Sequence, residues 1–597
     1  MKMSRRQLTL LVVIGLTVRL VYLALFLRNY VPARDADHYL SIAAAFSDGH
    51  GVSDTYPFLF EHPTAFRPPL YPVLLGSLLV VTPGEGVLAG QLMNVVLGTF
   101  VVVLAAMVGC RIAGPRAGMV AGLAAAVYPP LLANDAVLLA ESLSLVLLLA
   151  VVLLLLERRA GLAGLASGLL ILTRPSAQAF ALVVAVWLVW KLGWRQAAQY
   201  GLVAAAIVVP WLVRNSLLVG SPMLVTSNGF NLAAKYSPEA QDPPHYFADS
   251  AFDPRFDPLR FRRSNEAELD RALLDYAVES VREKPAVVKD VLIRNASAFF
   301  ELRPWLNKGA ERNDGRNVTF RTLTLPAFYV VTAAGIFGLV LYRRRAGAQL
   351  LLITAVYFTL VSIVTVAPPR VRAPIDVALC IGAGLLVGRW AAASTILDGD
   401  SAPAAADPEV AGQHVRKGRR GASLILLTAV IVPSLVVATL VARSLVQDRA
   451  LDDARRALTR DDRVVADLAR HYPLNSESDQ PEFDPGRARE RSQRLEDDLW
   501  VLYPQLPSEL EDQAHSTARV LQEANTFATG LTLIILSEQE KADQEGRPWS
   551  IDEVRRRYQR RLRPRDTRFP PWEQFISGDS AREAAAMVDE LRRELAS

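Results

Sequence analysis

The sequence has little of the chemistry that marks soluble enzymes. It has only two cysteines in 597 residues, Cys110 and Cys380, and both lie in apolar segments, which excludes a disulfide framework or a cysteine-based metal site. The chain has no phosphate loop, no dinucleotide-binding glycine fingerprint, no HExxH and no nucleophile elbow. Its seven histidines do not cluster. No cofactor is predicted, and a divalent metal stays open without support from the residues.

Charged residues are scarce inside long hydrophobic runs that together dominate the chain, which is 51% hydrophobic. Each run is long enough, or nearly so, to cross a hydrocarbon core of about 30 Å. The net charge of +5 comes from basic clusters at the ends of the runs, so no nucleic-acid partner is expected. The predicted spans are Leu8–Leu27, Val87–Cys110, Ala117–Asn134, Val137–Leu156, Gly161–Thr173, Ala177–Trp190, Ala197–Val219, Leu323–Tyr342, Ala348–Ala367, Pro374–Gly388 and Ala422–Val441.

The fold class predicted from these runs is an all-α polytopic membrane protein with about eleven transmembrane helices. Lys and Arg cluster in alternate loops, and with this number of spans every cluster falls on one side. That side is predicted to be the cytoplasm, so the N-terminus is cytoplasmic and the protein belongs to the cell membrane. The segment Leu70–Thr82 is too short to span comfortably and reads as a re-entrant or surface helix.

The same reasoning divides the chain into domains. A transmembrane catalytic domain is predicted over residues 1–391, with outer loops at 28–86 and 220–322. An Ala/Pro/Asp-rich cytoplasmic linker follows at 392–421, and a last transmembrane helix at 422–442. Residues 443–597 are predicted to form a mostly helical soluble domain on the extracytoplasmic side.

Several arginines break the positive-inside pattern, because they map at or near the outer face. A charge near the membrane is costly, so a group of them on one face indicates a shared anionic partner such as a phosphate. The alternative is that each simply reaches the lipid headgroups. The residues concerned are Arg67, Arg174, Arg214, Arg370 and Arg372.

Acidic residues are predicted on the same face. Asp35 and Asp37 open the first outer loop, and Asp135 and Glu141 flank the outer turn between the third and fourth spans. Such carboxylates are candidates for a general base. Asp35 and Asp37 fit equally well as caps of a following helix, and Glu141 as a solvated helix end.

Several short motifs share an order and a topological placement that resemble a known family. The resemblance is to the membrane glycosyltransferases of the GT-C superfamily. The most similar branch contains bacterial relatives of the protein O-mannosyltransferases and of the aminoarabinose transferase that modifies lipid A. The motifs are Asp35-x-x-x-Tyr39-x-x-x-Ala43, Gly49-His-Gly51, Arg67-Pro-Pro-Leu-Tyr-Pro72, Leu172-Thr-Arg-Pro175, Pro210-Trp-Leu-Val-Arg-Asn215 and Arg370-Val-Arg-Ala-Pro-Ile-Asp376.

The resemblance covers about residues 8–390 and implies a reaction. A sugar linked to a polyprenyl phosphate would pass, with inversion, to an acceptor hydroxyl on a glycan, lipid or protein at the outer face. Asp35 would act as the base or orient the acceptor, and Arg67 would contact the lipid phosphate. Many relatives have Glu directly after the first Asp. Here Ala36 stands there and Asp37 is displaced by one position, which leaves the role of Asp37 open.

Two other functions remain open from the sequence. A flippase or exporter of lipid-linked sugars would place ionisable residues near the midplane of several helices. Here helix interiors are nearly free of charge apart from Arg19. An inactive scaffold is the other alternative, and the missing acid at Ala36 keeps it open.

Overall fold

The computed structural model describes residues 3–397, with gaps at residues 29, 31, 33, 55, 57–61, 83–85, 242–249, 253–255 and 257–265. The last transmembrane helix predicted at 422–442 and the soluble domain predicted at 443–597 lie outside the described residues. So does most of the linker predicted from residue 392, although the last described helix continues past that point to Leu397.

Long apolar helices form the body of the described chain, as the hydrophobic runs predict. Six segments in it are long and apolar enough to cross a membrane. The last begins in a short 3₁₀ turn, η4 (Pro369–Arg372), and continues in α18 (Ala373–Leu397). The other five are α1 (Arg5–Phe26), α4 (Gly86–Ala113), α10 (Trp194–Leu218), α16 (Val318–Leu341) and α17 (Ala346–Val364).

Shorter apolar helices complete the bundle, and the predicted fold class is confirmed: the protein is an all-α, multi-pass membrane protein. The predicted span at Ala117–Asn134 is divided, because Pro129 and Pro130 cannot continue the helix that precedes them. The shorter helices are α3 (Leu70–Val81), α5 (Pro115–Val127), α6 (Pro129–Asn134), α7 (Glu141–Leu156), α8 (Ala160–Ile171) and α9 (Ala177–Leu192).

Small residues let the helices of the bundle approach closely. Where α16 crosses α18, a side chain on Gly338 would overlap the carbonyl oxygen of Gly382. Close packing of this kind suits membrane helices, which gain little from apolar burial in lipid. The charge noted inside α1 is satisfied: the fully buried Arg19 donates to Asp135 at 2.8 Å, and Asp135 also accepts from Ser142 at 2.6 Å.

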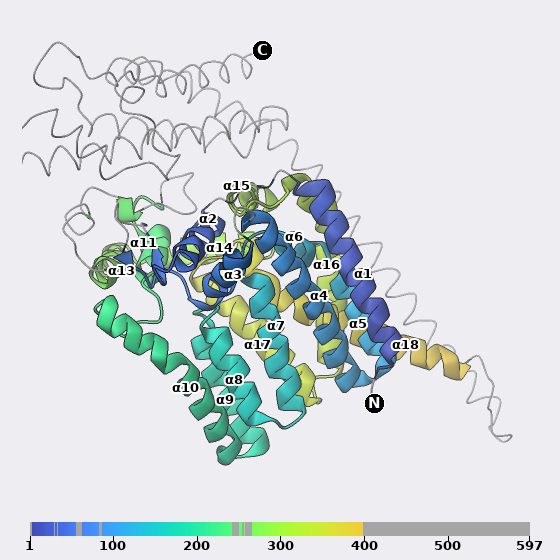
Figure 1. The fold of residues 1–597 in the computed structure, drawn as a ribbon. Helices are drawn as coiled ribbons and strands as arrows, with labels where there is room; N and C mark the ends of the chain where they lie inside the picture. The colour runs from blue at the N-terminus through green and yellow to red at the C-terminus, as the bar shows by residue number, and fades with distance from the viewer. Residues whose placement is uncertain are drawn as a thin grey trace, which may run out of the picture.

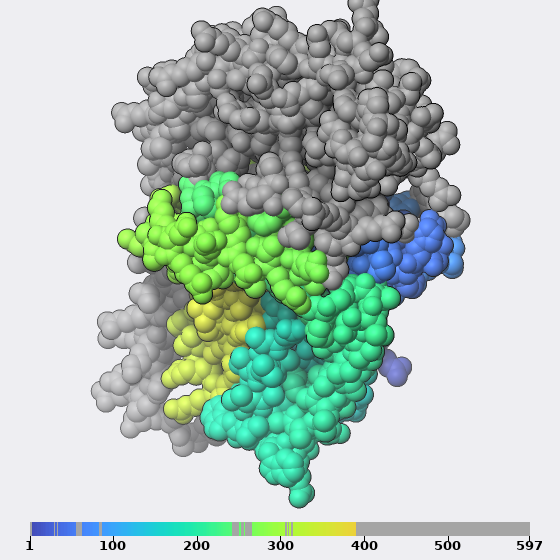
Figure 2. All heavy atoms as spheres, turned by 90° about the vertical axis from the view of Figure 1, so that its left-hand side faces the viewer, coloured from blue at the N-terminus to red at the C-terminus, as the bar shows by residue number. Residues whose placement is uncertain are grey.

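The two predicted outer loops fold as helices at one end of the bundle (Figure 1). Figure 2 shows α13 and α14, in yellow-green, lying across that end. α3 belongs to the same layer, since it packs chiefly against α2. The layer contains α2 (Asp35–Ser47), the strands β1 (Ser53–Asp54) and β2 (His62–Pro63), α11 (Asn228–Tyr236), η1 (Ser250–Phe252), α13 (Glu266–Glu283), α14 (Ala286–Phe299), η3 (Pro304–Asn307) and α15 (Lys308–Asn313).

The basic loops lie at the opposite end. The N-terminus is at that end in Figure 1, away from α2 and α15. Arg111, at the end of α4, pairs with Glu157, just after α7, at 2.5 Å. A side chain on Gly347, at the start of α17, would meet Ile112 and Leu156. The loops after α4, after α7 and before α17, which were predicted on one side of the membrane, therefore lie close together.

Candidate active site at the polar end of the bundle

Asp35 is the first residue of α2 and follows a residue, Arg34, whose backbone is strained. Arg34 precedes it with φ 49°, in the left-handed region that costs a non-glycine residue about 1–3 kcal/mol. The helix cap is Arg34, and α2 has no side-chain capping bond, so the reading of Asp35 as a helix cap is wrong. Its carboxylate instead binds two guanidinium groups, those of Arg67 and Arg370.

Arg67 is fixed by its neighbours in the chain. Pro68 and Pro69 follow it and restrict the backbone ahead of α3. The first amide of that helix, on Leu70, donates to the carbonyl of Leu172 at 3.0 Å. The guanidinium carbon lies 5.1 Å from the ring centre of Phe66 and 5.7 Å from that of Tyr39. This packing holds the side chain against Asp35.

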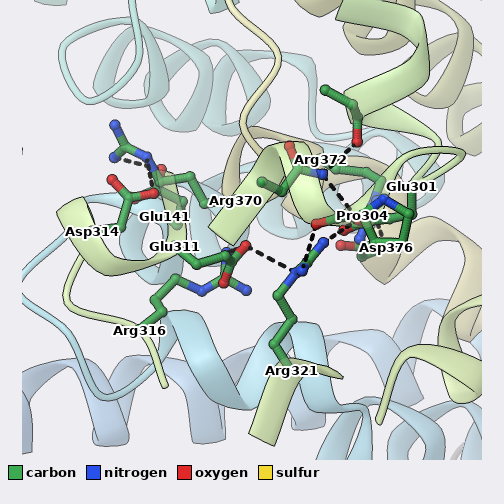
Figure 3. Close-up of polar contacts among 12 residues, drawn as sticks. Glu141, Glu301, Pro304, Glu311, Asp314, Arg316, Arg321, Arg370, Arg372 and Asp376 are labelled. Carbon is green, nitrogen blue, oxygen red and sulfur yellow. Dashed lines mark hydrogen bonds and ion pairs between the residues drawn. The ribbon is translucent and has the colours of Figure 1, made fainter. Parts of the chain in front are cut away.

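Arg370 lies among three carboxylates. It pairs with Asp35 through Nη2. Of the other two, which Figure 3 labels, Glu141 pairs with its Nη1 at 3.3 Å and Asp314 with its Nε at 3.0 Å. We call Asp35, Arg67, Glu141, Asp314 and Arg370 the Asp35 cluster. Burial alone would raise the pKa of Asp35, but Arg67 and Arg370 hold it below its usual value. Asp35 therefore stays ionised at neutral pH.

Glu141 is the first residue of α7 and is only 6% exposed. The alternative of a solvated helix end is therefore wrong. Its pairing with Arg370 joins α7 to the segment before α18 across 229 positions of sequence.

Arg174 lies next to the Asp35 cluster. Its Nη2 donates to the carbonyl of Val371 at 2.9 Å, and its guanidinium packs over the ring of Phe358 at 5.5 Å. The charges of Glu141 and Arg370 both act on it. Arg67, Arg174 and Arg370, from three separate motifs, are thus brought together.

Arg372 and Arg214 are not brought into the cluster. Arg372 points away from Arg370, toward Glu301 at 3.7 Å and Asp376 at 3.1 Å (Figure 3). We call this group, with its neighbours Glu311, Arg316 and Arg321, the Arg372 cluster. Arg214 donates to the carbonyls of Thr64 and Val52, both at 2.7 Å. It fastens α10 to the first outer loop.

Asp37 lies on the first turn of α2, as Asp35 does, and it is half-buried. Its charge acts on Tyr30, whose hydroxyl accepts from the amide of Leu138 at 3.2 Å. It is Asp35 that pairs with Arg67 and Arg370.

Two acidic residues of the second outer loop were missed from the sequence. Glu266 accepts from the hydroxyls of Thr64 and Thr226, at 2.5 and 2.6 Å, and so joins the two outer loops. Asp314 enters the Asp35 cluster from the turn before α16. Neither stands in a recognisable motif, and each reaches its partners only through the fold. Within the described residues, no group of three or more His, Cys, Asp or Glu is placed to hold a metal ion.

No protein-family model matches the chain, and no curated protein matches it in sequence. Solved structures do match. One is the oligosaccharyltransferase AglB from Archaeoglobus fulgidus, in complex with an inhibitory peptide and a dolichol-phosphate. It has a TM-score of 0.42 and 12% identity, over 73% of this chain and 55% of that one. This chain therefore spans about half the length of AglB.

Another is ArnT from Cupriavidus metallidurans bound to undecaprenyl phosphate. It has a TM-score of 0.39 and 14% identity, over 98% of this chain and 77% of that one. Its apo state matches at a TM-score of 0.40, also with 14% identity, over 98% of this chain and 76% of that one. AglB and ArnT are members of the GT-C superfamily, which the sequence motifs also resemble.

Proposed function

We propose that the protein is a GT-C-type membrane glycosyltransferase. It transfers a sugar from a polyprenyl-phosphate donor to an acceptor hydroxyl at the extracytoplasmic face, with inversion. The observation that carries this proposal is the convergence of Arg67 and Arg370 on Asp35, with Arg174 beside them, at one end of a bundle of membrane helices.

The Asp35 cluster contains guanidinium N–H groups that are available to bind a phosphate. Arg67 Nε has no hydrogen-bond acceptor among the described residues, and Arg370 Nε has beside it only Asp314 Oδ2, which is 3.0 Å away but not aligned as a hydrogen bond. A buried donor without an acceptor is costly, and a phosphate oxygen would satisfy it. Arginine is suited to this ligand because its fork makes two parallel, charge-assisted bonds.

The reaction follows from this placement. The acceptor oxygen forms a bond to the anomeric carbon while the bond from that carbon to the phosphate oxygen breaks. The electron pair of the broken bond stays on the phosphate, whose negative charge grows. Preorganised cations stabilise such charge, typically by a factor of about 10²–10³ for each donor. The hydroxyl proton passes to a carboxylate, so neither an oxidant nor a reductant is required.

The basic loops at the opposite end of the bundle support the extracytoplasmic placement of the Asp35 cluster. Arg111 and the loops around it are basic, and basic short loops favour the cytoplasm. The Asp35 cluster, at the other end, then faces the extracytoplasmic space. A donor carried on a lipid needs no nucleotide-binding motif, and the sequence has neither a phosphate loop nor a dinucleotide-binding glycine fingerprint.

A transfer assay tests the proposal. Membranes containing the full chain are given a panel of labelled undecaprenyl-phosphate hexoses, and label leaving the lipid fraction is followed. We expect transfer with one of these donors and a loss of about 10²-fold or more for Asp35→Asn, since misplaced arginines cost that much. Asp37→Asn is the matched control and should cost less.

Other outcomes would contradict the proposal. A flippase would move the labelled donor across a vesicle membrane without breaking its sugar–phosphate bond. A scaffold would do neither. Full activity in both aspartate variants would show that the first-loop acids are structural.

A further inference from the structure

Asp314 shares Arg370 with Asp35 but differs from it in hydrogen bonding. Both oxygens of Asp35 are occupied, Oδ1 by Arg67 and Oδ2 by Arg370. Asp314 Oδ2 lies 3.0 Å from Arg370 Nε, yet the pair is not aligned as a hydrogen bond. Among the described residues no donor binds this oxygen. Asp314 Oδ2 therefore accepts no hydrogen bond from the described residues, whereas each oxygen of Asp35 accepts one from an arginine.

The backbone holds Asp314 at this position. Gly315 follows it with φ 70°, and a side chain there would overlap the ring of Tyr30. Only glycine fits both the conformation and the space. The turn between α15 and α16 is thereby pressed onto the first outer loop, where Asp314 meets Arg370.

The charged groups around Asp314 come from four parts of the fold. Arg370 faces it from η4, Asp35 from α2, Arg316 from its own turn and Glu311 from α15. Tyr30 faces it from the segment before α2. Burial is the largest influence and raises the pKa of Asp314 to about 7, since Asp35 and Glu311 offset part of what Arg370 contributes.

The two aspartates are thus shifted in opposite directions, the pattern that separates acid–base residues from permanently charged ones. A base works best when its pKa is near the working pH. Asp35, held low by two arginines, accepts a proton poorly.

We propose that Asp314 is the general base that receives the proton of the acceptor hydroxyl, while Asp35 remains ionised and orients Arg67 and Arg370. This inference rests on the proposed function. As the acceptor oxygen bonds to the anomeric carbon, its proton moves to Asp314 Oδ2 and the phosphate leaves with the electron pair. Asp314 then releases the proton to solvent before the next turnover.

The test is the dependence of kcat/KM on pH between about 5.5 and 8.5, because this ratio reports the ionisation of the free enzyme's base. The wild type should lose activity as the pH falls through about 7, where Asp314 becomes protonated. Asp314→Asn should lose about 10²–10⁴-fold and show no inflection there. Asp314→Glu should recover part of the lost activity and part of the inflection. Binding of undecaprenyl phosphate by each variant, measured separately, shows that it is folded.

Asp270→Asn is the matched control. Burial raises the pKa of Asp270 to about 6, so this residue titrates in the same window, but it accepts from Gly229 and Phe230 in α11, outside the Asp35 cluster. This variant should keep both the rate and the inflection. An active wild type with a flat profile would overturn the assignment of Asp314 alone. So would an Asp314→Asn variant that keeps the inflection. A wild type that transfers no sugar would overturn the proposed function itself.

Discussion

Arg370 and Arg372 stand two positions apart in η4, and their side chains enter different clusters. Successive residues of a 3₁₀ turn point about 120° apart, so positions i and i+2 do not share a face. Arg370 meets Asp35, Glu141 and Asp314. Arg372 is 3% exposed and donates to the carbonyl of Phe299 at 2.7 Å, so its role is to hold the outer helices together.

Replacing the two arginines should therefore affect different properties, phosphate binding for Arg370 and thermal stability for Arg372. Arg370→Lys should weaken binding of undecaprenyl phosphate while the protein keeps its thermal stability, because lysine keeps a charge among the three carboxylates but loses the bidentate fork. Arg372→Ala leaves Asp376 buried without its cation, whereas Glu301 keeps Arg321, and breaking such a buried pair costs about 3–5 kcal/mol. Thermal unfolding in detergent, beside the binding measurement, separates the two effects. Equal loss of binding in two equally stable variants would return Arg372 to the phosphate site.

At the scale of helices, the hydrophobic runs predicted the elements well. The run at 87–110 lies within α4, and that at 323–342 lies almost wholly within α16. The end of α5 before Tyr128 is encoded by Pro129-Pro130, but the apolar run Ala117–Asn134 was long enough to be predicted as one span. Arg67 and Asp35 could be proposed as site residues, because both were predicted at the outer face and both stand in motifs that resemble those of a known family.

The other residues of the site could be recognised only from the folded structure. Asp314 follows α15, a helix of six residues, in a polar loop where nothing distinguishes it from other acids. Its partner Arg370 lies 56 positions away, counting from 314 to 370, and is reached only when α16 and α17 have packed. Arg372 looked equivalent to Arg370, because sequence spacing does not show which way a 3₁₀ turn directs its side chains.

Close packing of α16 on α18 gives a prediction at this scale. Gly338→Ala adds a methyl group where the carbonyl of Gly382 lies, so the helices must separate. Overpacking of this kind typically costs about 1–3 kcal/mol, which should lower the Tm measured by tryptophan fluorescence in detergent. Gly201→Ala in α10 is the control, because nothing lies within 4 Å of the added atom. An unchanged Tm in Gly338→Ala would show that the two helices are less tightly packed.

For the whole molecule, the separation of a basic end from the Asp35 cluster predicts a topology. Cysteines placed at two exposed positions, Lys284 in the second outer loop and Arg344 in a basic loop, report on the two ends. The native Cys110 and Cys380 are buried and should give little background. Lys284→Cys should react with an impermeant maleimide in intact cells, and Arg344→Cys only after permeabilisation. The reverse pattern would put the cluster in the cytoplasm.

Binding of a polyprenyl phosphate by Arg67 variants tests the phosphate site most directly. Purified full-length protein is titrated with undecaprenyl phosphate, and Kd is compared for the wild type, Arg67→Lys and Arg67→Ala. The exposed Arg303, also in an outer loop, supplies the control Arg303→Ala. Affinity should fall in the order wild type, Arg67→Lys, Arg67→Ala, because lysine keeps the charge but loses the bidentate fork. Arg303→Ala should bind as the wild type does. Equal affinity across all of these proteins would mean that Arg67 does not bind the phosphate, and the proposed donor site would be wrong.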